Sequence, residues 1–156
     1  MDKLWKIWQG NARGIFFLVC RGKCIFDIFK GGEVKLLTNN PAFLNYDKKN
    51  IEVDYRETDY LGILKIARDY VHENYRILTH PLYGSVKPNE TVYRSVVLVE
   101  GDSTDTDSVV LLASAIETFE KFKGNRRTPA WIDRVKEDFS VIDYDLITNA
   151  IERIIK

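Results

Sequence analysis

The stretch "SVVLVE" (Ser95–Glu100) decides the fold, because it is almost continuously apolar over the length of one β-strand. A strand of this kind is buried on both faces, so other elements must cover it on each side. We therefore expect this segment to lie inside a sheet that has further structure packed against both of its faces.

Strand and helix patterns alternate on either side of this stretch. Strands are predicted where short apolar or alternating runs end in turn-forming residues, at residues 34–38, 51–55 and 75–78. Helices are predicted where apolar residues recur at three- and four-residue steps, at residues 57–74, 108–124, 130–139 and 143–156. A short helix is also expected at residues 42–49, next to Pro41.

This alternation predicts the α/β class. We expect a small three-layer sandwich with a mostly parallel sheet of about four strands and a helical C-terminus. Residues 79–94 join the last two strands without a helix, so an antiparallel pairing is the alternative at that point. In open α/β sheets, ligands bind at the carboxyl ends of the parallel strands.

The composition limits the classes of protein to which this chain can belong. Its 156 residues suffice for one domain with a real core. Basic and acidic residues both number 23, so no overall field attracts nucleic acid or a membrane surface. No apolar run is long enough to cross a bilayer, and no nucleotide or metal motif appears. We expect a cytoplasmic protein with no cofactor, no metal, and no nucleic-acid or membrane partner; its oligomeric state stays open.

The first 33 residues differ from the rest. They hold both cysteines and two of the three tryptophans, and they lack a strand or helix period. Reverse translation of "KGGEV" (residues 30–34) permits a purine-rich ribosome-binding sequence followed by GUG, a bacterial start codon. We therefore interpret residues 1–33 as a translated leader and residues 34–156 as a single domain. The alternative is a genuine N-terminal hairpin docked on an edge of that domain.

Two polar segments are candidates for a binding site. In the first, "TNNP", the side chains of Thr38, Asn39 and Asn40 follow a strand directly and precede a helix. They would hold a small polar ligand, or they would only cap the helix and form the turn.

The second segment is the long loop "THPLYGSVKPNETVYRS" at residues 79–95. His80 would exchange protons near neutral pH, and Lys87 would hold a phosphate or carboxylate. The backbone at Gly84 and Ser85 would turn its N–H groups toward an anion. The remaining ligand-binding candidates here are Asn89 and Glu90. The alternative is an ordered loop whose polar groups satisfy one another. A functional site requires that the two segments meet at one rim.

Several motifs resemble the GrdX family. These are "KLLTNNP" (residues 35–41), "RDYVH" (68–72), the long loop itself, and a spaced pattern of matching residues over 131–151. Arg94 stands where the family has Lys and keeps the charge for an anion contact, whereas Val92 replaces a Pro. GrdX proteins are encoded among the genes for glycine, sarcosine and betaine reductase in anaerobes that ferment amino acids.

The resemblance implies a role beside that reductase and not as the reductase, since the domain carries no selenocysteine and no cysteine pair. Two hypotheses follow. In the first, the chain is an accessory protein that binds a reductase subunit or a small anionic ligand through the two loops. In the second, it is a small enzyme in which His80 is the acid/base. Lys87, Thr38, Asn39 and Asn40 would then position an anionic substrate.

Overall fold

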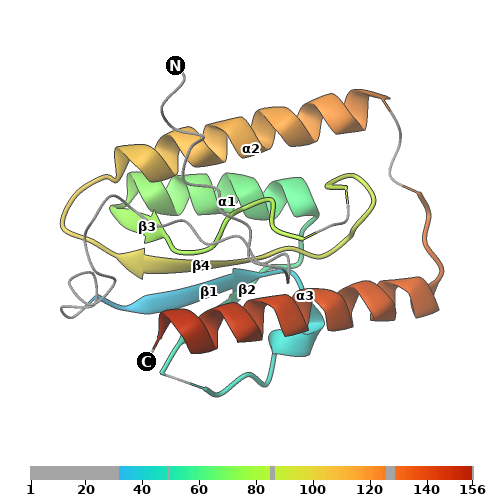
Figure 1. Cartoon of the computed structure of the whole chain (residues 1–156), viewed down its shortest axis with the longest axis horizontal. Coiled ribbons are helices and arrows are strands. Elements are labelled where there is room, and N and C mark those ends of the chain that lie inside the picture. The colour runs from blue at the N-terminus through green and yellow to red at the C-terminus, as the bar shows by residue number, and fades with distance from the viewer. Residues whose placement is uncertain (1–31, 49, 85–86, 126–128, 156) are drawn as a thin grey trace.

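The computed structural model describes residues 32–48, 50–84, 87–125 and 129–155, whose arrangement is drawn in Figure 1. Apart from residues 32 and 33, the expected N-terminal extension lies outside the described residues and stays a prediction. In chain order, the elements are β1 (Val34–Thr38), the 3₁₀ turn η2 (Pro41–Phe43), β2 (Glu52–Tyr55), α1 (Tyr60–His72), β3 (Tyr75–Ile77), β4 (Ser95–Glu100), α2 (Thr106–Asn125) and α3 (Asp133–Ile154).

The four strands form one sheet in the order β2-β1-β4-β3. β1 pairs with β2 in parallel, whereas β4 pairs antiparallel with both β1 and β3. The prediction of about four strands is confirmed, but the prediction of a mostly parallel sheet is wrong.

The reason lies in the connection between β3 and β4. The described residues of this connection form no helix, and β4 returns beside β3 as the second arm of a hairpin that has a long loop. β1, β2 and β3 all run in one direction, and β4 enters between two of them in the opposite direction. The start of β4 therefore lies at the same edge of the sheet as the ends of the other three strands.

Helices cover both faces of the sheet, with α1 and α2 on one side and α3 on the other (Figure 1). Successive residues of β4 serve opposite faces, as the period of a strand requires. Val96 and Leu98 join the core beneath α1 and α2, while Val97 joins the core beneath α3. All five residues of 95–99 are buried, so the expectation for "SVVLVE" is confirmed.

Local sequence explains where α1 and η2 begin. The Asp59 side chain accepts a hydrogen bond from the Gly62 amide at 2.8 Å and so caps α1. Asn40 caps η2 in the same way, with Pro41 in its first turn. The short helix expected at residues 42–49 is reduced to this single 3₁₀ turn.

The C-terminal region forms one helix where two were predicted. α3 runs without interruption from Asp133 to Ile154. Residues 140–142 contain no Gly or Pro, so nothing in the chain ends the helix there. No helix in the described part of the chain combines the length and the apolarity that a bilayer crossing needs.

Truncation of Leu36 to alanine should expose how much the core beneath α3 contributes to stability. Leu36 is fully buried in β1 within that core. We expect Leu36→Ala to lower the free energy of unfolding by about 2–5 kcal/mol, measured by urea denaturation. Leu44→Ala is the matched control, because Leu44 is 58% exposed and its loss leaves no cavity. Similar losses in both variants would contradict this placement of the core.

Candidate functional site

The two polar segments meet because β1 ends beside the start of β4. Thr38 is the partner of Ser95 in the sheet, and their hydroxyl oxygens lie 2.7 Å apart. The Thr38 hydroxyl accepts from the Asn40 amide at 2.9 Å, and the Ser95 hydroxyl donates to the Asp143 carboxylate at 2.6 Å. These bonds form one directed chain from the Asn40 amide through two hydroxyls to a carboxylate on α3.

Asn39 joins three segments through one carboxamide. Its oxygen accepts from the Arg94 amide at 2.7 Å. Its nitrogen donates to the carbonyls of Thr58 and Val92, both at 2.9 Å. Only a side chain that is both a donor and an acceptor can make this set of bonds. Asn39 is 6% exposed, so its carboxamide groups serve the fold first.

Asn40 performs the same task against α3. Its carboxamide nitrogen donates to the Ser140 carbonyl at 2.9 Å and to Asp143 at 3.0 Å. Its oxygen accepts from the Ala42 amide at 3.0 Å and from the Ser140 hydroxyl at 2.6 Å. Asn40 has no exposed surface. Its side chain caps η2 and also holds α3 against the end of β1.

Asp143 is the buried acceptor at the centre of these bonds. It is 5% exposed and accepts from Asn40, from Ser95 and from the Tyr83 hydroxyl. Burial first, and then the charge of Asp143, raise the pKa of Tyr83 well above its usual range, so this hydroxyl stays protonated and donates. We did not predict Asp143 as a site residue. The sequence did contain a signal for it. Asp143 lies four residues before Ile147 and eight before Ile151, so its carboxylate falls on the apolar stripe of the predicted helix.

Arg94 lies in this network and not at the surface. It is 4% exposed, and its guanidinium carbon is 4.5 Å from the Tyr60 ring centre and 4.0 Å from that of Tyr83. One terminal nitrogen donates to the Tyr83 carbonyl at 3.0 Å. The guanidinium is therefore held between two aromatic rings, where the planar group of Arg stacks better than an ammonium would.

His80 is half-buried near Arg94. Its Nδ1 accepts from the Leu82 amide at 3.1 Å. Burial first, and then the positive charge of Arg94, lower the pKa of this imidazole below its usual 6.5, so it is mainly neutral at pH 7. His80 helps to order the turn that follows it.

The other candidates in the loop do not gather around one point. Lys87 has 56% of its side chain exposed and lies 3.8 Å from Glu90 in an ion pair. Asn89 is buried, and its carboxamide oxygen has no hydrogen-bond partner among the described residues. Gly84 is exposed with φ of 96°, a conformation that favours glycine. Ser85 lies outside the described residues.

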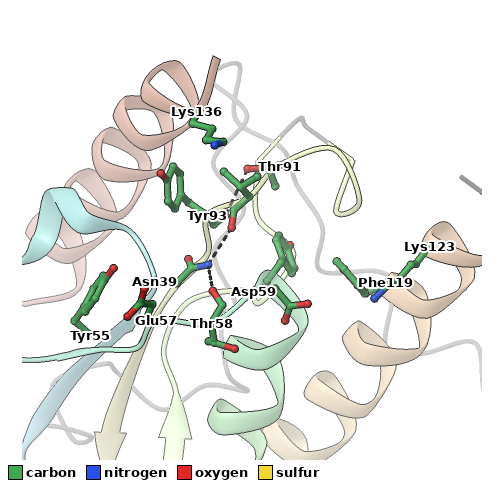
Figure 2. A pocket seen from close by; sticks show the side chains of 12 residues that line it. Asn39, Tyr55, Glu57, Thr58, Asp59, Thr91, Tyr93, Phe119, Lys123 and Lys136 are labelled. Atoms are coloured by element: carbon green, nitrogen blue, oxygen red, sulfur yellow. Dashed lines mark hydrogen bonds between the residues drawn. The ribbon is translucent and has the colours of Figure 1, made fainter. Parts of the chain in front are cut away.

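A cavity of about 370 Å³ opens at the edge where β1 and β2 end (Figure 2). Of the predicted ligand-binding residues, Asn39 is the one that lines it. Its walls come from the ends of β1, β2 and α2, the starts of α1 and α3, and the segment before β4; they are Asn39, Tyr55, Glu57, Thr58, Asp59, Tyr60, Thr91, Val92, Tyr93, Phe119, Lys123 and Lys136. Its four charged side chains come from three separate places in the sequence, so no motif revealed them.

Replacement of Asn40 by alanine tests the buried network. The variant leaves Ser140 and the charged Asp143 short of a donor, so we expect a loss of roughly 1–3 kcal/mol or more in the free energy of unfolding. Asn45→Ala makes the same change at an exposed position and should be nearly neutral. Equal urea midpoints for the two variants would contradict the role of the network.

His80 should make stability depend on pH. Because the folded state disfavours the protonated imidazole, the unfolded chain binds more protons as the pH falls through about 6.5. Stability contributed by the neutral imidazole is therefore present above that pH and lost below it. Urea denaturation between about pH 7.5 and about pH 5.5 should show a smaller decrease for His80→Gln than for the wild type. Equal decreases in the wild type and in His80→Gln would contradict this role of the imidazole.

Comparison with known proteins agrees with the motifs that resemble GrdX. The profile of the GrdX-like protein family matches residues 35–152. The matched region runs from β1 into the last turn of α3 and so includes every segment that meets at the buried network. No curated protein and no solved structure is significantly similar to the chain. The chain belongs to the GrdX-like protein family.

Proposed function

We propose that this chain is an accessory protein of the glycine, sarcosine and betaine reductase system, and that it acts by binding and not by catalysis. Its binding surface would be the sheet edge that carries the cavity of Figure 2, and its partner a reductase subunit or a small charged ligand. The association with the reductase comes from the family resemblance, and the choice of surface comes from the contacts described above.

One observation supports binding most strongly. The polar side chains that the sequence offers as reagents, namely Thr38, Asn39, Asn40 and Arg94, are all buried and bonded to other parts of the chain. A group that acts on a substrate must reach it, and of these four only Asn39 borders the cavity. The same bonds fix the edge of the sheet firmly, which suits a preformed surface for recognition.

His80 gives little support to the enzyme hypothesis. Its Nδ1 is used by the Leu82 amide, and three of the residues that would position a substrate, Thr38, Asn39 and Asn40, are buried. Lys87, the intended anion contact, pairs with Glu90 and does not line the cavity. The imidazole therefore has a structural use within the loop, which supports binding over catalysis.

Co-purification tests this proposal. The tagged chain would be expressed in cells together with the reductase genes, and the captured subunits quantified by mass spectrometry. We expect at least one reductase subunit to be enriched, and Glu57→Lys to reduce its capture by about tenfold or more by reversing a charge at the cavity.

Glu73→Lys is the matched control, since Glu73 is exposed at the far end of α1 and does not line the cavity. It should capture as much subunit as the wild type. The proposal fails if no subunit is enriched over a tag-only preparation, and the choice of surface fails if both variants behave alike.

A further inference from the structure

The strand β2 (Glu52–Tyr55) is outermost on its side of the sheet, so only one side of its backbone pairs with a neighbouring strand. The Arg56 amide donates to the Thr38 carbonyl of β1 at 2.8 Å. Because the hydrogen-bonding groups of a strand point alternately to its two sides, the amides and carbonyls of Val53 and Tyr55 point away from β1. These groups make no hydrogen bond with any other residue that the structure describes. This side of β2 can therefore receive a further strand.

The outermost strand on the other side of the sheet, β3, is better protected. The Ile77 amide points away from β4 and donates to the Ser108 hydroxyl of α2 at 3.1 Å. Proteins also protect outer strands by placing Pro or Lys in them, and β2 contains neither. The two sides of the sheet thus differ, and β2 is the side that favours pairing.

The acidic side chains of β2 do not oppose such pairing by their charge alone, because each has a cation beside it. Glu52 lies 2.7 Å from the Lys35 ammonium group, and Asp54 lies 2.7 Å from the Arg56 guanidinium group. The Arg56 side chain is 50% exposed, and a guanidinium group has five N–H donors. Asp54 also accepts from the Tyr70 hydroxyl at 2.8 Å, which still leaves acceptor sites on its two oxygens.

A second copy of the chain fits β2 in one register. Two identical antiparallel strands pair about a two-fold axis, with the outward-pointing residues of one facing those of the other. An axis at Glu52 or at Asp54 places that carboxylate opposite its own copy, and an axis at Val53 places Glu52 opposite Asp54 of the second copy. An axis at Tyr55 instead places Asp54 opposite Arg56 of the second copy, and by symmetry this pair occurs at both ends.

We propose that two copies of this chain associate through β2, antiparallel about a two-fold axis at Tyr55, and so join their sheets. Tyr55 and its copy exchange N–H···O bonds at the axis, where their rings are cross-strand neighbours. On the opposite face, Asp54 and Arg56 of the two copies alternate in one network of opposite charges. The contact is short, so the dimer is weak and reversible.

This association goes beyond the proposed function, because it concerns the chain alone. It also has a consequence for the surface described above. Tyr55 lines the cavity of Figure 2, so each cavity borders the interface with the second copy. An extended segment of another protein would use the same backbone groups of β2, but it would not supply the reciprocal ion pairs by symmetry.

Sedimentation equilibrium of the purified full chain, from about 1 to about 500 µM, tests the association without any reductase present. We expect a monomer–dimer equilibrium within this range. Arg56→Asp turns both reciprocal ion pairs into repulsions, so it should weaken dimerisation by about tenfold or more. Arg68→Asp is the matched control, because Arg68 is 44% exposed and pairs with Asp69 on α1. It should leave the dimerisation constant within about twofold of the wild type.

Amide hydrogen exchange of the wild type tests the pairing without any variant. The Tyr55 amide should exchange quickly in dilute protein and at least about threefold more slowly at the highest concentration, because the second copy then accepts its hydrogen bond. The Asp54 amide points toward β1 and should stay protected at every concentration. This contrast between neighbouring amides distinguishes pairing along β2 from a dimer formed elsewhere.

A chain that stays monomeric throughout this range would overturn the inference. So would a dimer that Arg56→Asp leaves intact, or one in which the Tyr55 amide exchanges equally fast at all concentrations. Protection of this amide that appears only when a reductase subunit is added would assign β2 to that subunit and not to a second copy. Thermal unfolding checks that each variant folds. Capture of a reductase subunit does not require the dimer, so the proposed function can stand if the dimer fails.

Discussion

The buried carboxylate of Asp143 constrains this structure more than any other single group, because a charge removed from water must find its hydrogen-bond donors inside the protein. Its three donors come from Asn40, Ser95 and Tyr83, which belong to the end of β1, the start of β4 and the long loop. Satisfying this one group therefore fixes α3, both central strands and the loop relative to one another.

Most of the polar residues in the two distinctive motifs serve this architecture. Asn39 and Asn40 act as fixed connectors between segments, and Arg94 fills the space between two tyrosine rings. Polar groups of this kind specify one arrangement of the chain because few alternatives would satisfy them all. The accessible surface that this arrangement creates lies beside the motifs, where the ends of several elements form the cavity.

Strand and helix periods predicted much of this fold. β1 and β4 begin and end at the residues that the sequence predicted, because each is a short apolar run between turn residues. The direction of β4 was not settled by its own residues, because an apolar run fits either direction and the pairing depends on what connects the strands. The division of α3 into two helices was wrong because charged and apolar residues near position 140 blurred the period without any residue that breaks a helix.

The candidate site was less accessible to prediction. The sequence did indicate that Thr38–Asn40 and the loop before β4 belong together, and their direct hydrogen bonds agree with that placement. It did not indicate Glu57 or Lys123, because a charge on an exposed turn and a charge at the end of a helix are common and carry no local signal. Their significance arises only when β2, α1 and α2 bring them to one cavity.

The hydrogen bonds of Asn40 also bear on how the protein acquires its structure. Its partners Ser140 and Asp143 lie 100 and 103 residues farther along the chain, and Thr38 meets Ser95 across 57 residues. Contacts between such distant positions slow the search for the native state, since each closes a large loop before it yields any stabilisation. On the ribosome, the polar end of β1 must wait for α3 to emerge, and until then its polar groups bond to water in place of their protein partners.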